Sequence, residues 1–388
     1  MKSLWFKIRS TVENLSFIAA GAFLSIIPRN RRLIVFGAWE GTRYDDNARY
    51  LFEYCLSNRK DLRCVWHTAS GQVEEEMRAM GLPVYRIRSA RAFYNICRAK
   101  YIVCTNSDHD YGWNFFSCGA TVVNLWHGSG PKKAGYEIGT LPTKFGQFQT
   151  RVKRDLMNYH YVTTSGWMAD RYSRLFNIDR KRVLNLGQAR NDLFYSPHDN
   201  PLRALYPGRR IVVYMPTFRE EGGEPVPMDL GLILDLPRLD ALCEKHGMVF
   251  LVKFHQWTAG TVPPEYKNIR KLYDISLRVQ MILDAADILI TDYSSCFVDH
   301  LLLDRPQILF AYDLRDYMTK DRSLYGDYRS DATGPVCEDS ASLLAELERV
   351  AAGSDSYSSK RHLIRDRYYS PENQCPVAGK QLEAILSL

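Results

Sequence analysis

The stretch Thr121–Lys133, TVVNLWHGSGPKK, begins as a short apolar run and continues into a loop of Gly, Ser and Pro. The run Thr121–Leu125 is typical of a buried strand, and loops that follow strands in α/β proteins lie at the carboxyl edge of the sheet, where ligands bind. His127 in such a loop can accept a proton near neutral pH. The Gly-Ser-Gly run lets the backbone approach a ligand, and the two lysines add positive charge. The stretch therefore predicts an α/β fold with a ligand site at His127; the alternative is a histidine bonded only to backbone.

A second stretch, Ala286–Ser295, ADILITDYSS, has the same design. An apolar strand pattern runs into Thr-Asp-Tyr-Ser-Ser, and a helical pattern begins at Cys296. Hydroxyl side chains at a helix start cap free N–H groups, and that end of a helix attracts anions. The alternative interpretation is ordinary capping without a ligand. Two strand-to-loop sites in separate halves of one chain favour a functional role for both.

The length and composition indicate a globular protein of two domains. At 388 residues the chain is too long for one ordinary hydrophobic core. Its 24% charged and 46% hydrophobic residues are typical of a folded rather than a disordered chain. The nine cysteines include no CxxC pair, and several lie in apolar runs. We interpret them as reduced core residues of a cytosolic protein rather than as disulfides or zinc ligands.

Positive charge is concentrated in two segments. Residues 1–33 contain six basic side chains and one acidic side chain, and residues 132–182 contain eleven basic and four acidic side chains. In a chain of net charge +7, such segments favour an anionic surface or an anionic substrate. No nucleic-acid partner is expected, because the sequence contains no zinc knuckle, RNP-type motif or Gly-Lys-Ser/Thr phosphate loop.

The first 28 residues start with basic side chains and continue as a mostly apolar run, Leu15–Ile27. This run is shorter than the ~20 residues that span a bilayer, and no small-residue cleavage site of a secretory signal precedes the basic residues that follow. We expect an amphipathic helix in the interface of an anionic membrane, which predicts a peripheral protein at the cytoplasmic face of the cell membrane. The alternative is a helix packed on the protein's own surface.

From residue 32 onward, apolar strand patterns alternate with helical patterns, which predicts parallel sheets covered by helices. The expected strands of the first half are residues 33–37, 64–67, 84–87 and 101–105, with helices at 47–57, 74–80 and 90–99, and the His127 strand is expected to close this half. Segment Lys144–Tyr172 interleaves basic and aromatic residues at near-helical spacing. We interpret it as a membrane-facing surface, an acceptor-binding surface or a helix pair that links domains.

The alternation restarts at residue 183, and strands of this half end in polar residues. The strand from Arg210 leads to Thr217 and Arg219, and the strand from Met248 ends in Lys253 and His255. Cationic donors, hydroxyls and a helix N-terminus are the groups that hold a diphosphate in proteins. The sequence therefore predicts a diphosphate site at these strand ends, formed by Arg219, Lys253, His255, Ser294 and Ser295.

Several short motifs, in this order, resemble the CDP-glycerol glycerophosphotransferase family, the teichoic-acid and capsule enzymes that transfer polyol phosphate from a CDP-activated donor. The resemblance covers roughly residues 30–330 and implies a GT-B fold of the α/β class, in which two Rossmann-like domains face each other across a cleft. With the segment described above, this fold would carry an N-terminal membrane-associating helix. The motifs are Leu125–Gly128 with Pro131–Lys133, Gly187 with Arg190–Asp192, Pro216–Arg219, Val252–His255, Thr291–Ser295, and Arg305–Pro306 with Tyr312–Leu314.

The same resemblance implies roles for individual residues. His127 and His255 would be the catalytic residues, with His127 as the base for the acceptor hydroxyl and His255 at the donor diphosphate. Two departures from the family pattern concern the loops: Ser129 replaces the usual Thr, and Lys-Phe-His-Gln at residues 253–256 replaces the usual Lys-Pro-His-Pro. The donor-binding residues would be Thr217, Arg219, Lys253, Thr291, Asp292, Ser294 and Ser295. The residues at the acceptor or in the cleft would be Gly128, Ser129, Lys132, Lys133, Arg190 and Asp192.

The implied reaction is attack by an acceptor hydroxyl on the β-phosphate of CDP-glycerol, or of a related CDP-polyol, with release of CMP. The acceptor would be a saccharide or lipid-linked glycan of a cell-surface polymer, and we expect a priming or transition step that adds one or a few units. The alternatives are a polyol-phosphate polymerase, a nucleotide-sugar glycosyltransferase and a non-catalytic sugar- or lipid-binding scaffold. No metal site is expected, because Asp and Glu do not cluster at ligand spacing; Mg²⁺ bound with the donor diphosphate is left open.

The expected domain organisation follows from these assignments. Residues 1–30 would be the membrane-associating segment, and residues 31–182 a Rossmann-like acceptor domain. Residues 183–345 would form a Rossmann-like domain for the CDP donor. Residues 346–388 would be C-terminal helices that pack back across the domains.

Overall fold

The computed structural model describes residues 12, 15, 16, 19–21, 23–133, 135–137, 143–221, 224–255, 258–272, 277–320 and 324–388. Most of the expected membrane-associating segment, residues 1–30, and Gln256 in the loop after His255 lie outside the described residues. Among the residues that are described, no helix is both long and apolar enough to cross a bilayer. The chain divides into two units, of which the first comprises Met1–His127, Gly139–Asp192 and Ser370–Leu388, and the second Gly128–Ile138 and Leu193–Tyr369.

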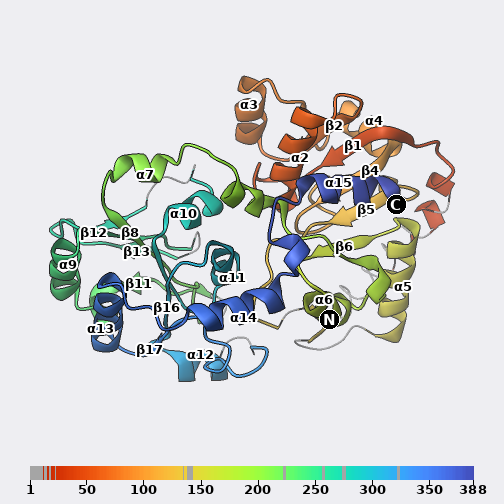
Figure 1. Cartoon of the computed structure of the whole chain (residues 1–388). Helices are drawn as coiled ribbons and strands as arrows, with labels where there is room; N and C mark the ends of the chain where they lie inside the picture. Colours follow the sequence, from red (N-terminus) through yellow and green to blue (C-terminus); the bar gives the residue numbers. More distant parts are fainter. Residues whose placement is uncertain are drawn as a thin grey trace. The chain divides into compact units, whose positions relative to one another are not determined.

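Seven parallel strands form the sheet of the first unit, in the order β3-β2-β1-β4-β5-β6-β7 (Figure 1). A parallel sheet is covered on both faces, which explains why β4 and β5 read as continuous apolar runs and are buried over nearly their whole length. The strands are β1 (Asn30–Phe36), β2 (Arg63–Thr68), β3 (Val84–Arg86), β4 (Ala99–Cys104), β5 (Thr121–Asn124), β6 (His160–Thr163) and β7 (Val183–Asn185).

Serine side chains fix the starts of three helices in this unit. Ser70, Ser89 and Ser165 each accept a hydrogen bond from the backbone N–H three residues further on, which satisfies one of the free donors of the first turn. The last helix of the chain, α15, returns to this unit and lies beside α2 (Figure 1). The helices are α2 (Asp46–Asn58), α3 (Gly71–Ala79), α4 (Ala90–Arg98), α5 (Lys144–Leu156), α6 (Gly166–Phe176) and α15 (Ala378–Ser387).

The second unit contains a six-stranded parallel sheet in the order β14-β12-β8-β15-β16-β17. Its core is built on Tyr214, Phe250 and Phe310 from the three strands β8, β12 and β16, all fully buried. The strands are β8 (Arg210–Met215), β12 (Met248–Val252), β14 (Ile269–Lys271), β15 (Ile288–Thr291), β16 (Gln307–Phe310) and β17 (Val336–Cys337). Two small pairs lie outside this sheet: β9 (Glu220–Glu221) with β10 (Glu224–Pro225), and β11 (Met228–Asp229) with β13 (Gly260–Thr261).

Helices α7 to α14 belong to the second unit. The helices that follow residue 345, the expected end of the donor domain, do not all belong to one unit. Helix α14 belongs to the second unit, whereas Ser370–Leu388 belongs to the first. The helices are α7 (Pro201–Leu205), α8 (Leu230–Ile233), α9 (Leu236–Lys245), α10 (Val279–Ala285), α11 (Cys296–His300), α12 (Leu314–Lys320), α13 (Ser340–Ala351) and α14 (Ser358–Tyr368).

Two expectations about the middle of the chain are wrong. The His127 strand, β5, does not close the first half, because β6 and β7 add to the same sheet. The strand at residue 183 therefore ends the first sheet rather than opening the second, and the units divide after Asp192. The segment Lys144–Tyr172 conceals β6 between two helices, since its four buried residues, HYVT, are too short a run to interrupt the helical spacing around them.

Both sheets have the strand order of a doubly wound fold. The order reverses between β1 and β4 in the first unit and between β8 and β15 in the second. Ligands of open parallel sheets bind outside the carboxyl ends of the strands at such a reversal. Functional residues are therefore expected in the loops after β4 and β5 and in those after β8 and β15. The α/β class expected from the sequence is confirmed.

Candidate active site

His127 is the third residue after the end of β5, and contacts within the first unit hold it in place. Trp126 before it has a left-handed backbone (φ 55°), and the Trp126 carbonyl accepts a hydrogen bond from Asn47 Nδ2 at 2.8 Å. The imidazole packs against the rings of Trp126 and Trp39, with centroids 4.2 Å and 5.1 Å away. Non-glycine residues rarely adopt positive φ, so this loop is a constrained support for the histidine rather than a free connection.

The environment keeps His127 neutral. Its pKa is lowered to about 4, first by burial and second by the positive charge of Arg190, against a hydrogen bond with the backbone of Thr105. A histidine whose pKa lies well below 7 is deprotonated at neutral pH and can accept a proton. The neutral imidazole meets one requirement of a general base, which is to be unprotonated at the working pH.

Arg190 supports the His127 loop. Its Nη1 donates to Asp46 Oδ1 at 2.9 Å and to the His127 carbonyl at 2.8 Å. The side chains of Arg190 and Asp46 are each only 8% exposed, so this is a buried ion pair. Asn47 completes the arrangement, because its Oδ1 accepts a hydrogen bond from the Arg190 backbone N–H. Asp46 and Asn47 were not identified from the sequence; the Asp-Asp-Asn run at the start of α2 is the signal that indicates them.

Asp192 contacts the start of α15. Its two carboxylate oxygens accept hydrogen bonds from the backbone N–H groups of Val377 and Ala378, each at 2.8 Å. The carboxylate thus caps the last helix and ties it to the first unit. Burial raises the pKa of Asp192 to about 6, although the two N–H groups favour its charged form.

The raised pKa of Asp192 predicts a pH dependence of stability. The folded chain binds this proton more tightly than the unfolded chain, so the resulting stabilisation is present below the unfolded pKa of ~4 and is lost as the pH rises through 6. We expect Asp192→Asn to remove about 3 kcal/mol of pH dependence between pH 4 and 7. Urea unfolding of both proteins across this range measures it, with the exposed Asp199→Asn as the control. Parallel curves for wild type and Asp192→Asn would contradict the assignment.

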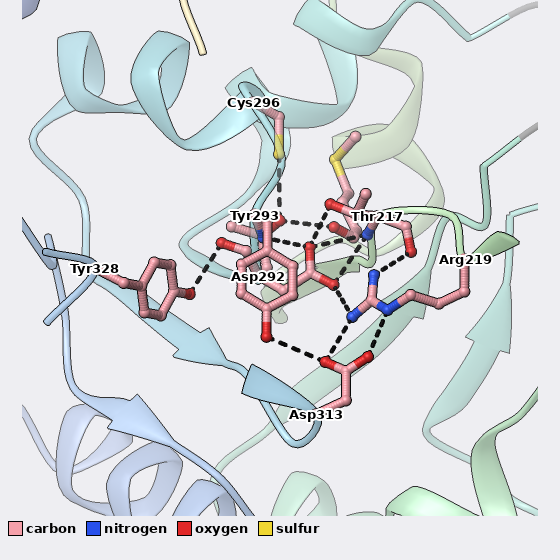
Figure 2. Close-up of polar contacts among 9 residues, drawn as sticks. Thr217, Arg219, Asp292, Tyr293, Cys296, Asp313 and Tyr328 are labelled. Atoms are coloured by element: carbon pink, nitrogen blue, oxygen red, sulfur yellow. Dashed lines mark hydrogen bonds and ion pairs between the residues drawn. The ribbon is translucent and has the colours of Figure 1, made fainter. Parts of the chain in front are cut away.

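In the second unit, Arg219 lies between two carboxylates at the reversal of the sheet (Figure 2). Its Nη2 donates to Asp292 at 2.9 Å, and its Nε donates to Asp313 at 2.6 Å. Its Nη1 donates to the carbonyl of Thr217 at 2.8 Å. The Thr217 hydroxyl in turn donates to Asp292 at 2.6 Å. The loops after β8, β15 and β16 are thereby joined by one polar network.

Tyrosines surround this network. Tyr293 Oη donates to Asp313 at 3.1 Å, and Tyr328 Oη donates to the Asp292 carbonyl at 3.0 Å (Figure 2). The Arg219 guanidinium lies 5.1 Å from the ring centroid of Tyr317. Burial raises the pKa of Tyr293 and Tyr328 well above the usual range, so both phenols stay protonated and donate. Asp292 is fully buried, and most donors of Arg219 are occupied by protein acceptors. The network therefore orders the loop Thr291–Ser295.

Ser294 and Ser295 lie at the end of this loop, where α11 begins. Thr291 is wholly buried and donates to the Met215 carbonyl at 2.7 Å, so it joins β15 to β8 rather than facing a ligand. The Ser294 hydroxyl accepts from the Cys296 N–H at 3.4 Å. Thr217, Arg219, Thr291, Asp292 and the two serines are thus brought together, as expected. Tyr293, Tyr328 and Asp313 also belong to this network, although none of them was predicted as a site residue; Asp313 appeared only within a family motif.

The segment that follows His127 belongs to the second unit, not to the domain of residues 31–182 in which it was expected. Pro131 O accepts from the Tyr325 N–H at 2.8 Å, and Lys132 forms an antiparallel bridge with Leu324. Gly130 lies against Ser295, and a Cβ on this glycine would come within 3.1 Å of the serine Cβ. The structure therefore groups Gly128, Ser129, Lys132 and Lys133 with the serine loop, and the close approach at Gly130 explains the glycine.

His255 follows β12 and is exposed, with its ring stacked on Phe218 at a centroid distance of 5.3 Å. Phe254, which stands where the family pattern has Pro, is buried against Gly260, where an added Cβ would come within 2.4 Å of the ring. Lys253, at the end of β12, is partly buried. A packed aromatic side chain thus fixes the loop that the absent prolines would otherwise stiffen. In the described part of the chain, no three His, Cys, Asp or Glu side chains form a group that could hold a metal ion.

Comparison with known proteins identifies the family. Residues 20–375 match the family described as CDP-Glycerol:Poly(glycerophosphate) glycerophosphotransferase. The chain is 27% identical to a teichoic acid glycerol-phosphate transferase of Staphylococcus aureus, over 94% of this chain and 96% of the relative. It is 24% identical to a teichoic acid poly(glycerol phosphate) polymerase of Bacillus subtilis, over 89% of this chain but only 48% of the relative.

The fold is similar to that of the wall teichoic acid polymerase TagF. The two chains superpose with a TM-score of 0.74 at 20% sequence identity, over 100% of this chain and 98% of the chain in a solved structure of a TagF variant. Another TagF structure was obtained after a soak with CDPG. The two parallel sheets are those of a GT-B-like fold of two domains. Because the family match extends over most of the sequence, the chain belongs to the CDP-glycerol:poly(glycerophosphate) glycerophosphotransferase family of enzymes.

Proposed function

We propose that this enzyme transfers glycerol phosphate from CDP-glycerol to a hydroxyl group of a saccharide or lipid-linked acceptor in teichoic acid synthesis. The acceptor oxygen attacks the β-phosphorus, the bond from that phosphorus to the bridging oxygen breaks, and CMP leaves. His127 takes the proton of the attacking hydroxyl. The observation that carries this proposal is a neutral imidazole at the carboxyl edge of a parallel sheet, in a chain of this family.

Residues of the second unit are proposed to hold the donor. Ser294, Ser295 and the backbone of their loop supply neutral hydrogen-bond donors, and Lys253 and His255 supply donors after β12. Arg219 carries one positive charge against the two negative charges of Asp292 and Asp313, so its contribution to the donor is indirect, through the order of the serine loop. Mg²⁺ accompanying the diphosphate is not needed for this scheme and stays a question for experiment.

The proposal is tested by mass analysis of the products that the purified protein forms from candidate donors. We expect CMP and a product heavier by one glycerol phosphate unit with CDP-glycerol, and no transfer from a UDP-sugar. Parallel reactions with CDP-ribitol identify the polyol, and reactions with EDTA show whether a metal ion is required. Sugar transfer without CMP release would replace this function by that of a nucleotide-sugar glycosyltransferase.

We propose further that the enzyme performs a priming or transition step. The similarity to a glycerol-phosphate transferase, over 94% of this chain and 96% of that relative, supports this. At large donor excess over a defined acceptor, we expect a product ladder that stalls after one or a few additions. Long products that form while most of the acceptor is unused would instead indicate processive polymerisation.

Peripheral attachment to the membrane is also proposed, from the basic, apolar start of the chain. In the described part of this segment, Val12, Leu15, Phe23 and Ile26 are exposed, which is unusual for large apolar side chains. We expect deletion of residues 1–28 to move the protein from the membrane fraction to the supernatant, since one short apolar segment with basic residues gives reversible binding. Co-sedimentation with anionic liposomes measures this, with circular dichroism to show that the truncated protein is folded. Equal sedimentation with and without the segment would place the attachment elsewhere.

A further inference from the structure

An apolar pocket of about 500 Å³ opens on the surface of the first unit, away from the loop of His127. Its volume is within the range of sites that take up a small ligand. Phe23 is 75% exposed and Trp113 is 38% exposed, although both are large and apolar. Phe93 extends the aromatic surface, because its ring packs edge-on against Trp113 and Phe116 at 5.3 Å and 4.7 Å. The pocket is lined by Ala20, Phe23, Leu24, Trp113, Asn114 and Phe116.

A group of cations adjoins this pocket. Arg29 donates from Nη2 to the carbonyl of Phe116, a pocket residue, at 3.0 Å, and from Nη1 to the carbonyl of Ile96 at 2.6 Å. The pairing of β1 with β4 places Asn30 opposite Ala99. Arg29 and Arg31 therefore lie beside Arg98 and Lys100, the residues that flank Ala99.

Among the described residues, neither Arg29, Arg31, Arg98 nor Lys100 forms an ion pair, and Nε of Arg29 is buried without a hydrogen-bond partner. Burial and the charges of Arg31 and Arg29 lower the pKa of Lys100, which shows that the three cations repel one another. Arg29 is held by four backbone carbonyls, so Arg31, Arg98 and Lys100 are the cations left for an anion. Cations without an ion-pair partner among the described residues, beside an exposed aromatic pocket, are complementary to an amphiphile with an anionic head and a hydrocarbon chain.

We infer that the pocket and these cations form a binding site for one anionic phospholipid of the bilayer, with the phosphate at the cations and an acyl chain against Phe23 and Trp113. The inference rests on the proposed membrane attachment, and it names the lipid-binding site through which the protein would attach. A bulk phospholipid is favoured over the acceptor because of where the site lies. Arg29 precedes β1 and Lys100 is the second residue of β4, whereas His127 follows the end of β5, so the two sites are at opposite edges of one sheet. A strand of six or seven residues separates these edges by about 20 Å.

The test uses monomeric short-chain phospholipids, which separates a binding site from general adsorption to a surface. Tryptophan fluorescence or calorimetry follows titration of the full chain with dihexanoyl phosphatidylglycerol, dihexanoyl phosphatidylcholine and glycerol phosphate. We expect saturable one-to-one binding of phosphatidylglycerol and weaker binding of the other two. Each further methylene that enters the pocket should strengthen binding about fourfold.

Matched variants identify the site. Phe23→Asp and Arg31→Glu are exposed changes and should each weaken phosphatidylglycerol binding at least tenfold. Leu232→Asp and Arg270→Glu change equally exposed residues of the second unit and should leave binding unaltered. All four variants should keep wild-type transfer to a water-soluble acceptor, because none touches the proposed catalytic residues. Loss of transfer in every protein, with lipid binding intact, would overturn the proposed function but not this site.

Four results would overturn the inference. Equal binding of phosphatidylcholine would remove the role of the cations, and equal losses in the control variants would place the lipid elsewhere. Co-sedimentation with vesicles in the absence of any monomer binding would keep peripheral attachment and refute the pocket. Much tighter binding of a short prenyl phosphate than of phosphatidylglycerol would assign the pocket to the tail of a lipid-linked acceptor instead.

Discussion

Replacement of His127 by asparagine or alanine is expected to lower the rate of glycerol phosphate transfer by about 10²–10⁴-fold, the usual contribution of a general base. The affinity for CDP-glycerol should change little, because the proposed donor residues belong to the second unit. Single-turnover rates at saturating donor and calorimetric donor binding measure the two quantities separately. Near-wild-type turnover in both variants would remove His127 from the mechanism.

His160 provides a matched control for this prediction. Burial also lowers its pKa to about 4, but it begins β6, at the edge of the sheet opposite to His127. We expect His160→Asn to keep the transfer rate, so a loss specific to His127 cannot be ascribed to removal of any buried histidine. The same assignment predicts the pH profile: His127 accepts a proton only when neutral, so kcat/KM should fall about tenfold per pH unit below pH 4 and be insensitive to this group near pH 7.

Replacement of Arg219 by alanine is expected to raise the dissociation constant for CDP-glycerol at least tenfold and to destabilise the second unit by about 3–5 kcal/mol. The instability arises because Asp292 and Asp313 would be left without their shared cation in a buried position. The loss of affinity follows from disorder of the loop that carries Ser294 and Ser295. Calorimetric donor titration and urea unfolding measure the two effects.

Two further variants separate loop order from direct contact. In Ser294→Ala/Ser295→Ala the Arg219 network is intact, so donor affinity should fall without loss of stability. In Arg219→Ala/Asp313→Asn one uncompensated charge is removed, so stability should partly recover while donor affinity stays low. Unchanged donor affinity in both Arg219→Ala and the double serine variant would refute the donor assignment for this loop.

The sequence was sufficient for the parts of the fold that local patterns encode. Buried parallel strands give continuous apolar runs, so β1, β2, β4 and β5 were recognisable, as were the loops that follow them. The motifs lie at successive strand ends, and their order along the chain was specific enough to indicate the family. His127 and the run Thr291–Ser295 were located in this way before any tertiary contact was known.

Local patterns also failed where an element was short or its partner was distant. β6 has four residues between two helices and was not recognised, whereas the strand at residue 183, β7, was recognised but assigned to the second half. Their membership of the first sheet depends on hydrogen bonds to strands far away in the sequence, and so does the division of the units after Asp192.

The roles of charged residues were decided only by tertiary structure. Arg190, Asp192 and Arg219 stand in motifs that suggest ligand contacts, yet the folded chain gives each of them protein partners: Asp46, the start of α15, and the Asp292–Asp313 pair. A sequence shows that a charge exists, but whether it is free for a ligand depends on which opposite charge or N–H group lies within about 3 Å. Those partners are 73–186 residues away along the chain, a separation that only folding removes.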